Sequence, residues 1–143
     1  MAEYSNAAKV IRQAHVLIKS EADIVDARQQ GRTVAEQTGF IRSSELAAIA
    51  TAISELARNI VDYALPGEIV VRPINQSRIK GVEIVARDKG PGIPDLDEAM
   101  LDGFSTGGGL GLGLPGVRRL TDEFEIQSVP GKGTTVKARK WIP

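Results

Sequence analysis

The segment from Ser43 to Ala64 places the strongest constraint on how this chain can fold. It contains neither glycine nor proline, and the pair Pro66–Gly67 follows soon after its end. At about 100° per residue, its apolar side chains gather on one face of a predicted helix. That face consists of Ile49, Ile53, Leu56, Ala57, Ile60 and Ala64. Such a helix must bury its apolar face, so the rest of the chain has to supply a second layer.

The flanking sequence predicts strands and further helices. Alternating or apolar runs predict strands at His15–Lys19, Glu68–Ile74, Gly81–Asp88, Glu123–Val129 and Thr134–Trp141. Other helices are expected from Ser20, as the capping residue, to Gly39, then over Asp95–Leu101 and over Leu114–Thr121. The two hairpins are expected to turn at Asn75–Lys80 and Pro130–Gly133. This order predicts an α+β fold, a two-layer α/β sandwich with helices on one face of a mostly antiparallel mixed sheet.

Length and composition predict a single soluble domain over residues 1–143, with residues 1–13 as a loose arm. The chain has 143 residues, of which 42% are hydrophobic and 25% charged, as is usual for globular proteins. Its formal net charge is zero, so no basic excess is available for nucleic acid or a membrane surface. The absence of cysteine excludes thiolate metal sites. We expect a cytoplasmic protein, because the chain shows neither a signal-peptide pattern nor an apolar run of about 20 residues.

A polar stripe lies opposite the apolar face of the helix that starts at Ser43. Within it, Glu55 and Asn59 are four residues apart and therefore neighbours on the helix surface. Such stripes are usually solvated faces. A binding site is the alternative, because an asparagine oxygen can ligate Mg²⁺ and a glutamate can accept a proton from an attacking hydroxyl. The helix alone leaves both interpretations open.

The motif Asp88-Lys-Gly90-Pro-Gly92 follows a predicted strand. Its glycines allow positive φ angles and a close approach between the backbone and a ligand. The Asp88 carboxylate, at the end of the strand, can accept a hydrogen bond from an exocyclic amine such as that of adenine. The same residues also form a good turn that needs no function.

Residues 107–113 include five glycines in seven positions and lead into a predicted helix with Pro115 in its first turn. So many glycines cost conformational entropy on folding, which a close-fitting loop around a ligand would explain. The N–H groups of the following helix can point at phosphate oxygens. A mobile surface loop remains the alternative.

Other motifs carry less information. Gly111-x-Gly113-x-x-Gly116 matches the dinucleotide-binding pattern, but a glycine loop precedes it and Val136 occupies the position where that pattern expects an acidic residue. No Walker-type phosphate loop is present in the sequence. His15 is expected to be an ordinary strand-edge histidine. The residues Gly131-Lys-Gly133-Thr134 suit a hairpin turn, from which Thr134 can also reach a nucleotide.

The order of these motifs resembles the four ATP-site boxes of the GHKL superfamily. The boxes are Glu55-x-x-x-Asn59, Asp88-x-Gly90-x-Gly92, Gly109-x-Gly111-x-Gly113 and Gly131-x-Gly133-Thr134. The resemblance extends over about residues 15–142. Within the superfamily, TAISELARNI, DKGPGIPD and DGFSTGGGLGLGLPGV are similar to the small serine/threonine kinases of the anti-sigma-factor type, in particular to stressosome serine kinases of the RsbT type.

This resemblance implies a Bergerat ATP-binding fold and a role for each box. Asn59 would ligate Mg²⁺, Glu55 would be the general base, and Asp88 would contact the adenine amine. The implied nucleotide-binding residues are Asn59, Asp88, Gly90, Gly92, Ile93, Gly107, Gly108, Gly109, Leu110, Gly111, Leu112, Gly113 and Thr134. Residues 107–113 would form a lid over the nucleotide.

The resemblance further implies a serine/threonine-protein kinase that uses ATP and Mg²⁺ in a stress-signalling partner switch. Its substrates would be STAS-domain proteins, RsbS-like and RsbR-like, and the released kinase would activate an RsbU-like phosphatase. The alternative is a nucleotide-gated protein-binding module of the anti-sigma-factor kind. In that case the glycine-rich lid would order around ATP, and turnover would be incidental.

Overall fold

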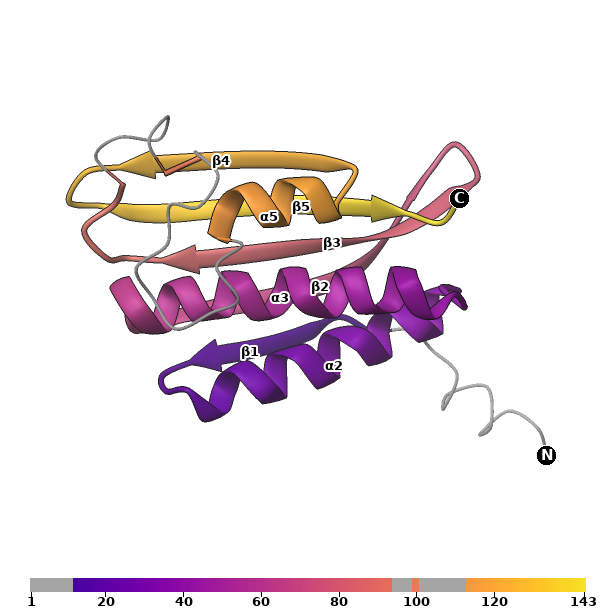
Figure 1. Ribbon diagram of the computed structural model, residues 1–143, viewed down its shortest axis with the longest axis horizontal. Helices are drawn as coiled ribbons and strands as arrows, with labels where there is room; N and C mark the ends of the chain where they lie inside the picture. Colours follow the sequence, from indigo (N-terminus) through magenta and orange to yellow (C-terminus); the bar gives the residue numbers. More distant parts are fainter. Residues whose placement is uncertain (1–11, 94–98, 101–112) are drawn as a thin grey trace.

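The computed structural model describes residues 12–93, 99–100 and 113–143 (Figure 1). The expected arm over residues 1–13 and the expected helix Asp95–Leu101 lie largely outside the described residues, as does most of the glycine run. The elements, in chain order, are β1 (Ala14–Ile18), α2 (Ala22–Thr38), α3 (Ser43–Tyr63), β2 (Gly67–Gln76), β3 (Ile79–Asp88), α5 (Gly113–Leu120), β4 (Glu123–Val129) and β5 (Gly133–Trp141). Among these residues no helix has the length and apolar character that a bilayer crossing requires.

The strands form a five-stranded sheet in the order β1-β2-β3-β5-β4. The four pairings between neighbouring strands are all antiparallel. The predicted α+β sandwich is therefore confirmed. Its sheet is simpler than the mixed sheet that we expected, because no parallel pair occurs among the described strands.

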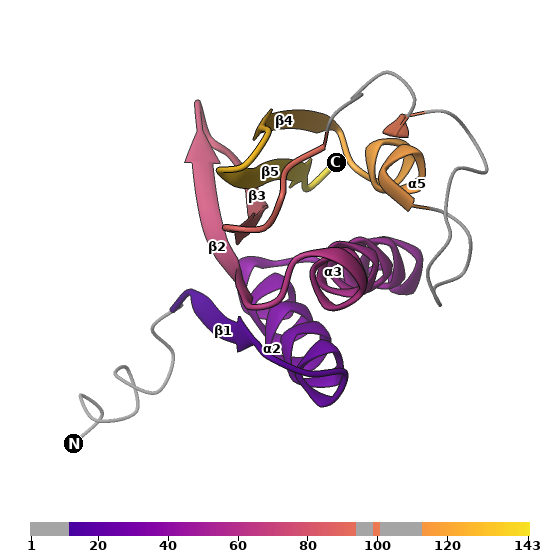
Figure 2. The same cartoon turned by 90° about the vertical axis from the view of Figure 1, so that its left-hand side faces the viewer.

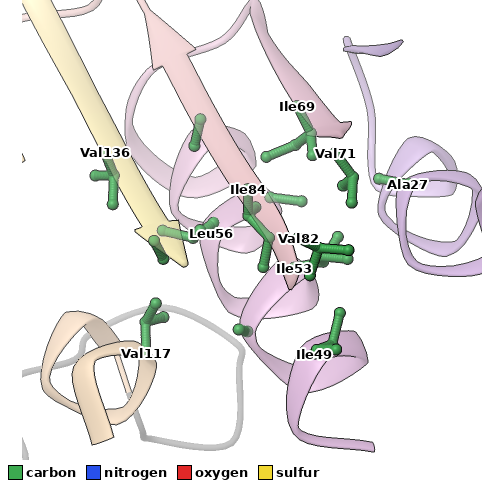
Figure 3. Close-up of a cluster of buried hydrophobic side chains, with 14 of the residues drawn as sticks. Ala27, Ile49, Ile53, Leu56, Ile69, Val71, Val82, Ile84, Val117 and Val136 are labelled. Atoms are coloured by element: carbon green, nitrogen blue, oxygen red, sulfur yellow. The ribbon is translucent and has the colours of Figure 1, made fainter. Parts of the chain in front are cut away.

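The helices α2, α3 and α5 lie together on one face of the sheet (Figure 2). The apolar face predicted for α3 is buried there, with Ile53 fully buried and Leu56 only 1% exposed. These side chains pack against Ile69, Val71 and Ile84 of the two central strands (Figure 3). One wide helix face thus forms the centre of the core, and the opposite side of α3 is available for other contacts.

Two local predictions about turns and caps are wrong. We expected the Ser20 side chain to cap the first helix, but that helix begins at Ala22 without a side-chain cap. Instead, the Asp23 carboxylate accepts the N–H groups of Lys19 and Ser20 at 2.8 and 3.0 Å. A charged carboxylate is a stronger acceptor than a hydroxyl, which explains why Asp23, and not Ser20, is the side-chain acceptor at the start of this helix.

The hairpin between β2 and β3 is tighter than the expected turn at Asn75–Lys80. Its strands pair as far as Gln76 and Ile79 and leave a two-residue turn. Ser77 and Arg78 adopt φ angles of 49° and 74° there. Positive φ at both positions suits the right-handed twist of a hairpin. The polar residues that we assigned to a turn belong to exposed ends of the strands.

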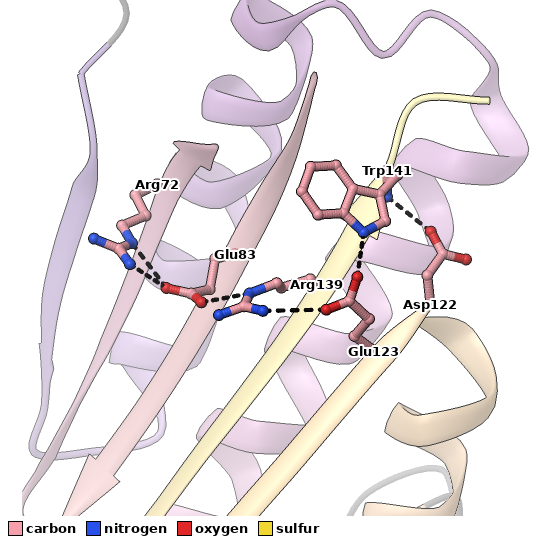
Figure 4. A network of polar contacts seen from close by, with 6 residues as sticks. All are labelled: Arg72, Glu83, Asp122, Glu123, Arg139 and Trp141. Atoms are coloured by element: carbon pink, nitrogen blue, oxygen red, sulfur yellow. Dashed lines mark hydrogen bonds and ion pairs between the residues drawn. The ribbon is translucent and has the colours of Figure 1, made fainter. Parts of the chain in front are cut away.

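The sheet face opposite the helices carries a row of alternating charges. We call Arg72, Glu83, Arg139 and Glu123 the charge ladder; they face one another across four strands (Figure 4). Glu83 is 1% exposed and accepts hydrogen bonds from Arg72 and Arg139, each at 2.8 Å. Burial by itself would raise the pKa of Glu83, but the hydrogen bonds from Arg139 and Arg72 outweigh it and hold that pKa below its ordinary value of 4.5.

Replacing Glu83 with glutamine should destabilise the sheet in a pH-dependent manner. The folded-state pKa of Glu83 is lowered, so its contribution is complete above 4.5 and is lost as the pH falls through the folded-state pKa. At neutral pH, Glu83→Gln should lower the free energy of unfolding by about 1–2 kcal/mol, since both arginines are partly exposed to solvent. Urea denaturation at several pH values should show the difference from the wild type shrinking in acid.

Glu125→Gln is the matched control. Glu125 lies on the same face of β4 as Glu123, and it makes no ion pair within the part of the chain that the structure describes. It should change stability little at any pH. Equal losses for the two variants at neutral pH would contradict a stabilising charge ladder.

Candidate functional site

The polar side of α3 carries a buried carboxylate and an available carboxamide. Glu55 is 5% exposed, and its Oε1 accepts the backbone N–H of Gly113 at 3.3 Å. Gly113 is the first residue of α5, where backbone N–H groups have no partner inside the helix and favour negative charge. Asn59 lies one turn further along α3 and is partly buried. Within residues 12–93, 99–100 and 113–143, no hydrogen bond reaches its carboxamide.

Asp88 ends β3 and divides its two oxygens between different environments. Oδ1 accepts the backbone N–H groups of Gly90 at 2.9 Å and Thr134 at 3.3 Å. These two bonds fix the carboxylate and join the loop after β3 to the start of β5. No hydrogen bond from the described residues reaches Oδ2, so this oxygen can accept a donor from a ligand.

Glycines allow the loop after β3 to pass close to its neighbours. A Cβ at Gly90 would lie 2.6 Å from the Cβ of Ala64, at the end of α3. A Cβ at Gly133, where φ is +104°, would lie 2.1 Å from the carbonyl oxygen of Asp88. The loop is therefore enclosed between the end of α3 and the β4–β5 hairpin, and side chains at these two glycines would force these segments apart.

Ser128 is a site residue that the sequence reasoning missed. Its hydroxyl accepts the N–H of Ile93 at 2.6 Å and shares a hydrogen bond with the Thr134 hydroxyl at 2.8 Å. It thus connects both sides of the Asp88 loop. A signal was available, because Ser128 falls on the same face of β4 as the core residues Phe124 and Ile126, where a polar residue needs a partner.

The structure brings together the sequence-predicted residues that it describes. Gly113 contacts Glu55, one helical turn from Asn59 on α3. Asp88, Gly90, Gly92, Ile93 and Thr134 form a second group, in which Gly90 lies against Ala64 at the end of α3. Gly107, Gly108, Gly109, Leu110, Gly111 and Leu112 lie outside the described residues. His15 is elsewhere, on the open sheet face, where it hydrogen-bonds Glu68. Together with Arg87, this contact holds the pKa of Glu68 below its ordinary value.

The two groups of residues suit an elongated ligand along α3. Glu55 and Ala64 are nine positions apart, which at the helical rise is about 14 Å, a length that an extended nucleoside triphosphate can span. The Asp88 end offers a hydrogen-bond acceptor for a nucleobase. The Glu55 end offers backbone N–H groups of α5 and the side-chain oxygens of Glu55 and Asn59. No cluster of three or more histidine or acidic residues in the described part of the chain could hold a metal by itself. The oxygen donor at Asn59 instead suits Mg²⁺, which keeps several waters and shares phosphate oxygens.

Comparison with known proteins agrees with this arrangement. Residues 45–142 match the family of histidine kinase-, DNA gyrase B-, and HSP90-like ATPases. The chain is 55% identical over 130 residues to the serine/threonine-protein kinase RsbT of Bacillus subtilis (strain 168). The aligned region covers 91% of this chain and 97% of that protein. It is 34% identical to an anti-sigma F factor of Caldanaerobacter subterraneus, over 68% of this chain and 71% of that protein. A mycobacterial sensor histidine kinase, MprB, has the same fold, with a TM-score of 0.53 at 17% identity, over 92% of this chain and 97% of that one.

Substitutions of two glycines in the β4–β5 turn should separate backbone strain from the contact with Asp88. Gly131 and Gly133 both have positive φ, but a Cβ at Gly131 would meet nothing within 4 Å. Gly131→Ala should therefore cost about 1 kcal/mol of stability, from backbone strain alone. Gly133→Ala should cost about 3 kcal/mol, because it also pushes β5 away from the Asp88 backbone. Urea denaturation measures both, and equal losses would contradict the close approach at Gly133.

Proposed function

The chain belongs to the histidine kinase-, DNA gyrase B-, and HSP90-like ATPase family and is a serine/threonine-protein kinase, and we propose that it phosphorylates STAS-domain proteins in a Mg²⁺-dependent, stress-signalling partner switch. The observation that carries this proposal is the position of Glu55. Its carboxylate lies beside the first N–H of α5 and one helical turn from Asn59. The proposed base thus lies beside a helix N-terminus and one helical turn from the proposed metal ligand.

The base of ATP is assigned to the Asp88 end of the site. Because Oδ1 is held by Gly90 and Thr134, Oδ2 is oriented to accept the exocyclic amine of adenine. Ser128 supports this end through Ile93 and Thr134. An acceptor at this position favours adenine over guanine, whose corresponding group is a carbonyl.

The phosphates are assigned to the Glu55 end, beside the start of α5. Backbone N–H groups at a helix N-terminus bind anionic oxygens. Asn59 would contribute one oxygen to Mg²⁺, and the ion, when bound, neutralises charge on the phosphates. Residues 107–112 precede α5 directly in the sequence, and we propose that they form the lid over this end.

Glu55 is proposed as the general base. It accepts the proton of the substrate serine or threonine hydroxyl as that oxygen bonds to the γ-phosphorus of ATP, while the bond from that phosphorus to the β–γ bridging oxygen breaks and ADP leaves. Its charge is stabilised by the Gly113 N–H. Positioning supplies most of the remaining rate acceleration.

The choice of protein substrates is supported by the similarity to RsbT and to anti-sigma F factors. We propose RsbS-like and RsbR-like STAS-domain proteins as substrates in the cytoplasm. Their phosphorylation would release the kinase, which would then bind and activate an RsbU-like phosphatase. A nucleotide-gated binding module is the second candidate, favoured by the likeness to anti-sigma F factors, and it predicts stable complexes without phosphate transfer.

Glu55→Gln should abolish phosphate transfer while leaving ATP binding intact. Glutamine retains the oxygen that accepts the Gly113 N–H but cannot take a proton from the hydroxyl. Transfer of label from γ-labelled ATP to a purified RsbS-like protein should fall by about a hundredfold or more. ATP affinity, measured by calorimetry with Mg²⁺, should change little.

Glu45→Gln is the control, because it makes the same chemical change in the first turn of α3. It should transfer phosphate at the wild-type rate. Unchanged transfer by Glu55→Gln would exclude Glu55 as the base. Stable binding of the RsbS-like protein without any transfer by the wild type would favour the binding module.

Asp88→Asn should weaken ATP binding without opening the loop. The asparagine oxygen can keep the hydrogen bonds to Gly90 and Thr134, but an NH₂ group then replaces Oδ2 and opposes the adenine amine. The dissociation constant for ATP should rise by about tenfold or more, as expected for loss of a charge-assisted hydrogen bond. Calorimetry measures this change, and a wild-type affinity for ATP would refute the assignment of Oδ2 to adenine.

A further inference from the structure

An open groove lies at the end of the sheet where the β2–β3 hairpin meets the end of β5. It has a volume of about 830 Å³ and is lined by Gln76, Ser77, Arg78, Ile79, Lys80, Glu123, Trp141, Ile142 and Pro143. Figure 1 shows the hairpin and the C-terminus together at one end of the molecule, away from the C-terminal end of β3. A groove of this volume can hold several side chains of a bound peptide.

The groove is separate from the nucleotide site. Strand β3 joins the two, with Ile79 at the groove and Asp88 at the site. Ten residues of strand rise about 30 Å in all. A partner held in the groove therefore leaves the nucleotide site accessible.

The groove includes apolar side chains, and hydrogen bonds hold its C-terminal wall in place. Ile79 is 51% exposed at the hairpin, so its apolar side chain is accessible to a ligand. The Trp141 indole donates to Glu123 at 2.6 Å, and the Trp141 N–H donates to Asp122 at 2.7 Å (Figure 4). The Ile142 N–H donates to the carbonyl of Lys80 at 2.8 Å. A fixed tryptophan beside an exposed isoleucine has the character of a protein-binding hot spot, because little conformational entropy remains to be lost on binding.

The charges of the groove favour an acidic ligand. Arg78 and Lys80 form no ion pair within the described part of the chain, so no described carboxylate pairs with their charges. Glu123 is the only acidic residue among those lining the groove. Its carboxylate is occupied by Arg139 at 3.1 Å and by Trp141, and these contacts lower its pKa. The groove therefore presents two cationic side chains, unpaired among the described residues, together with the apolar side chains of Ile79 and Trp141.

We propose that this groove binds an acidic segment of a protein partner that carries leucine-like apolar side chains. Carboxylates of the segment pair with Arg78 and Lys80, and its apolar side chains cover Ile79 and Trp141. A nucleic acid fits less well, because two cations in a chain of zero net charge offer few phosphate contacts. This docking site is independent of the kinase activity and of the identity of the kinase substrate.

The single tryptophan of the chain is a direct probe of this proposal. The test ligand is a synthetic hexapeptide with two central leucines and an aspartate and a glutamate on either side, titrated into the intact protein at low salt. Trp141 fluorescence should change in intensity and saturate. The double variant Arg78→Glu/Lys80→Glu should raise the dissociation constant by about tenfold or more, because attraction becomes repulsion. Ile79→Ser should also weaken binding, by loss of apolar contact.

Arg28→Glu/Arg42→Glu is the matched control, since it makes the same change in net charge at exposed positions outside the groove. It should bind the peptide within about threefold of the wild type, allowing for long-range charge effects at low salt. All variants should keep the circular dichroism and the ATP affinity of the wild type, which separates loss of docking from loss of fold. The proposal would be overturned if Trp141 fluorescence showed no saturable change, or if the two double variants weakened peptide binding equally. It would also be overturned if a peptide with lysines in place of its acidic residues, or a peptide without leucines, bound as tightly as the test peptide.

Discussion

The packing of α3 on the central strands is the contact on which the other features depend. Its apolar face supplies Ile49, Ile53 and Leu56 to the centre of the core, and this fixes the rotation of the helix about its axis. Once that rotation is fixed, Glu55 and Asn59 can only point away from the sheet. The same apolar pattern that requires a second layer therefore also orients the proposed base and the proposed metal ligand.

Asp88 has one oxygen that serves the fold and a second that we propose serves a ligand. One oxygen joins the loop after β3 to the start of β5, and the other has no hydrogen-bond partner among the described residues. The close approaches at Gly90 and Gly133 bring the same loop against α3 and β5. Three elements far apart in sequence thereby form one end of the site, which is rigid because its backbone contacts leave no space for side chains.

Much of this arrangement could be predicted from sequence because it depends on local periodicity. The buried face of α3, the five strands and the position of Asp88 at the end of β3 all follow from spacing and from turn residues. The position of Ser128 on the inner face of β4 indicated that it needs a partner, but the identity of that partner could not be predicted, because Ile93 lies 35 residues away. The two-residue turn at Ser77 and Arg78 was missed because polar residues at exposed strand ends look like a loop. The catalytic and ligand-binding roles rest on the family resemblance, and the structure adds the hydrogen bonds that make them chemically consistent.

Glu55 is a buried carboxylate whose surroundings differ from those of Glu83. A carboxylate that is 5% exposed loses most of its hydration, and this cost has to be recovered from hydrogen bonds. The Gly113 N–H, at 3.3 Å, is one of the contacts that hold the Glu55 carboxylate, whereas the Glu83 carboxylate is held by two arginines at 2.8 Å. An apolar residue at position 55 would fill the same space in α3 without any desolvation of charge. The chain instead places a carboxylate beside the N-terminus of α5, where negative charge is favoured, and one helical turn from Asn59. The proposed role as a general base would use that charge.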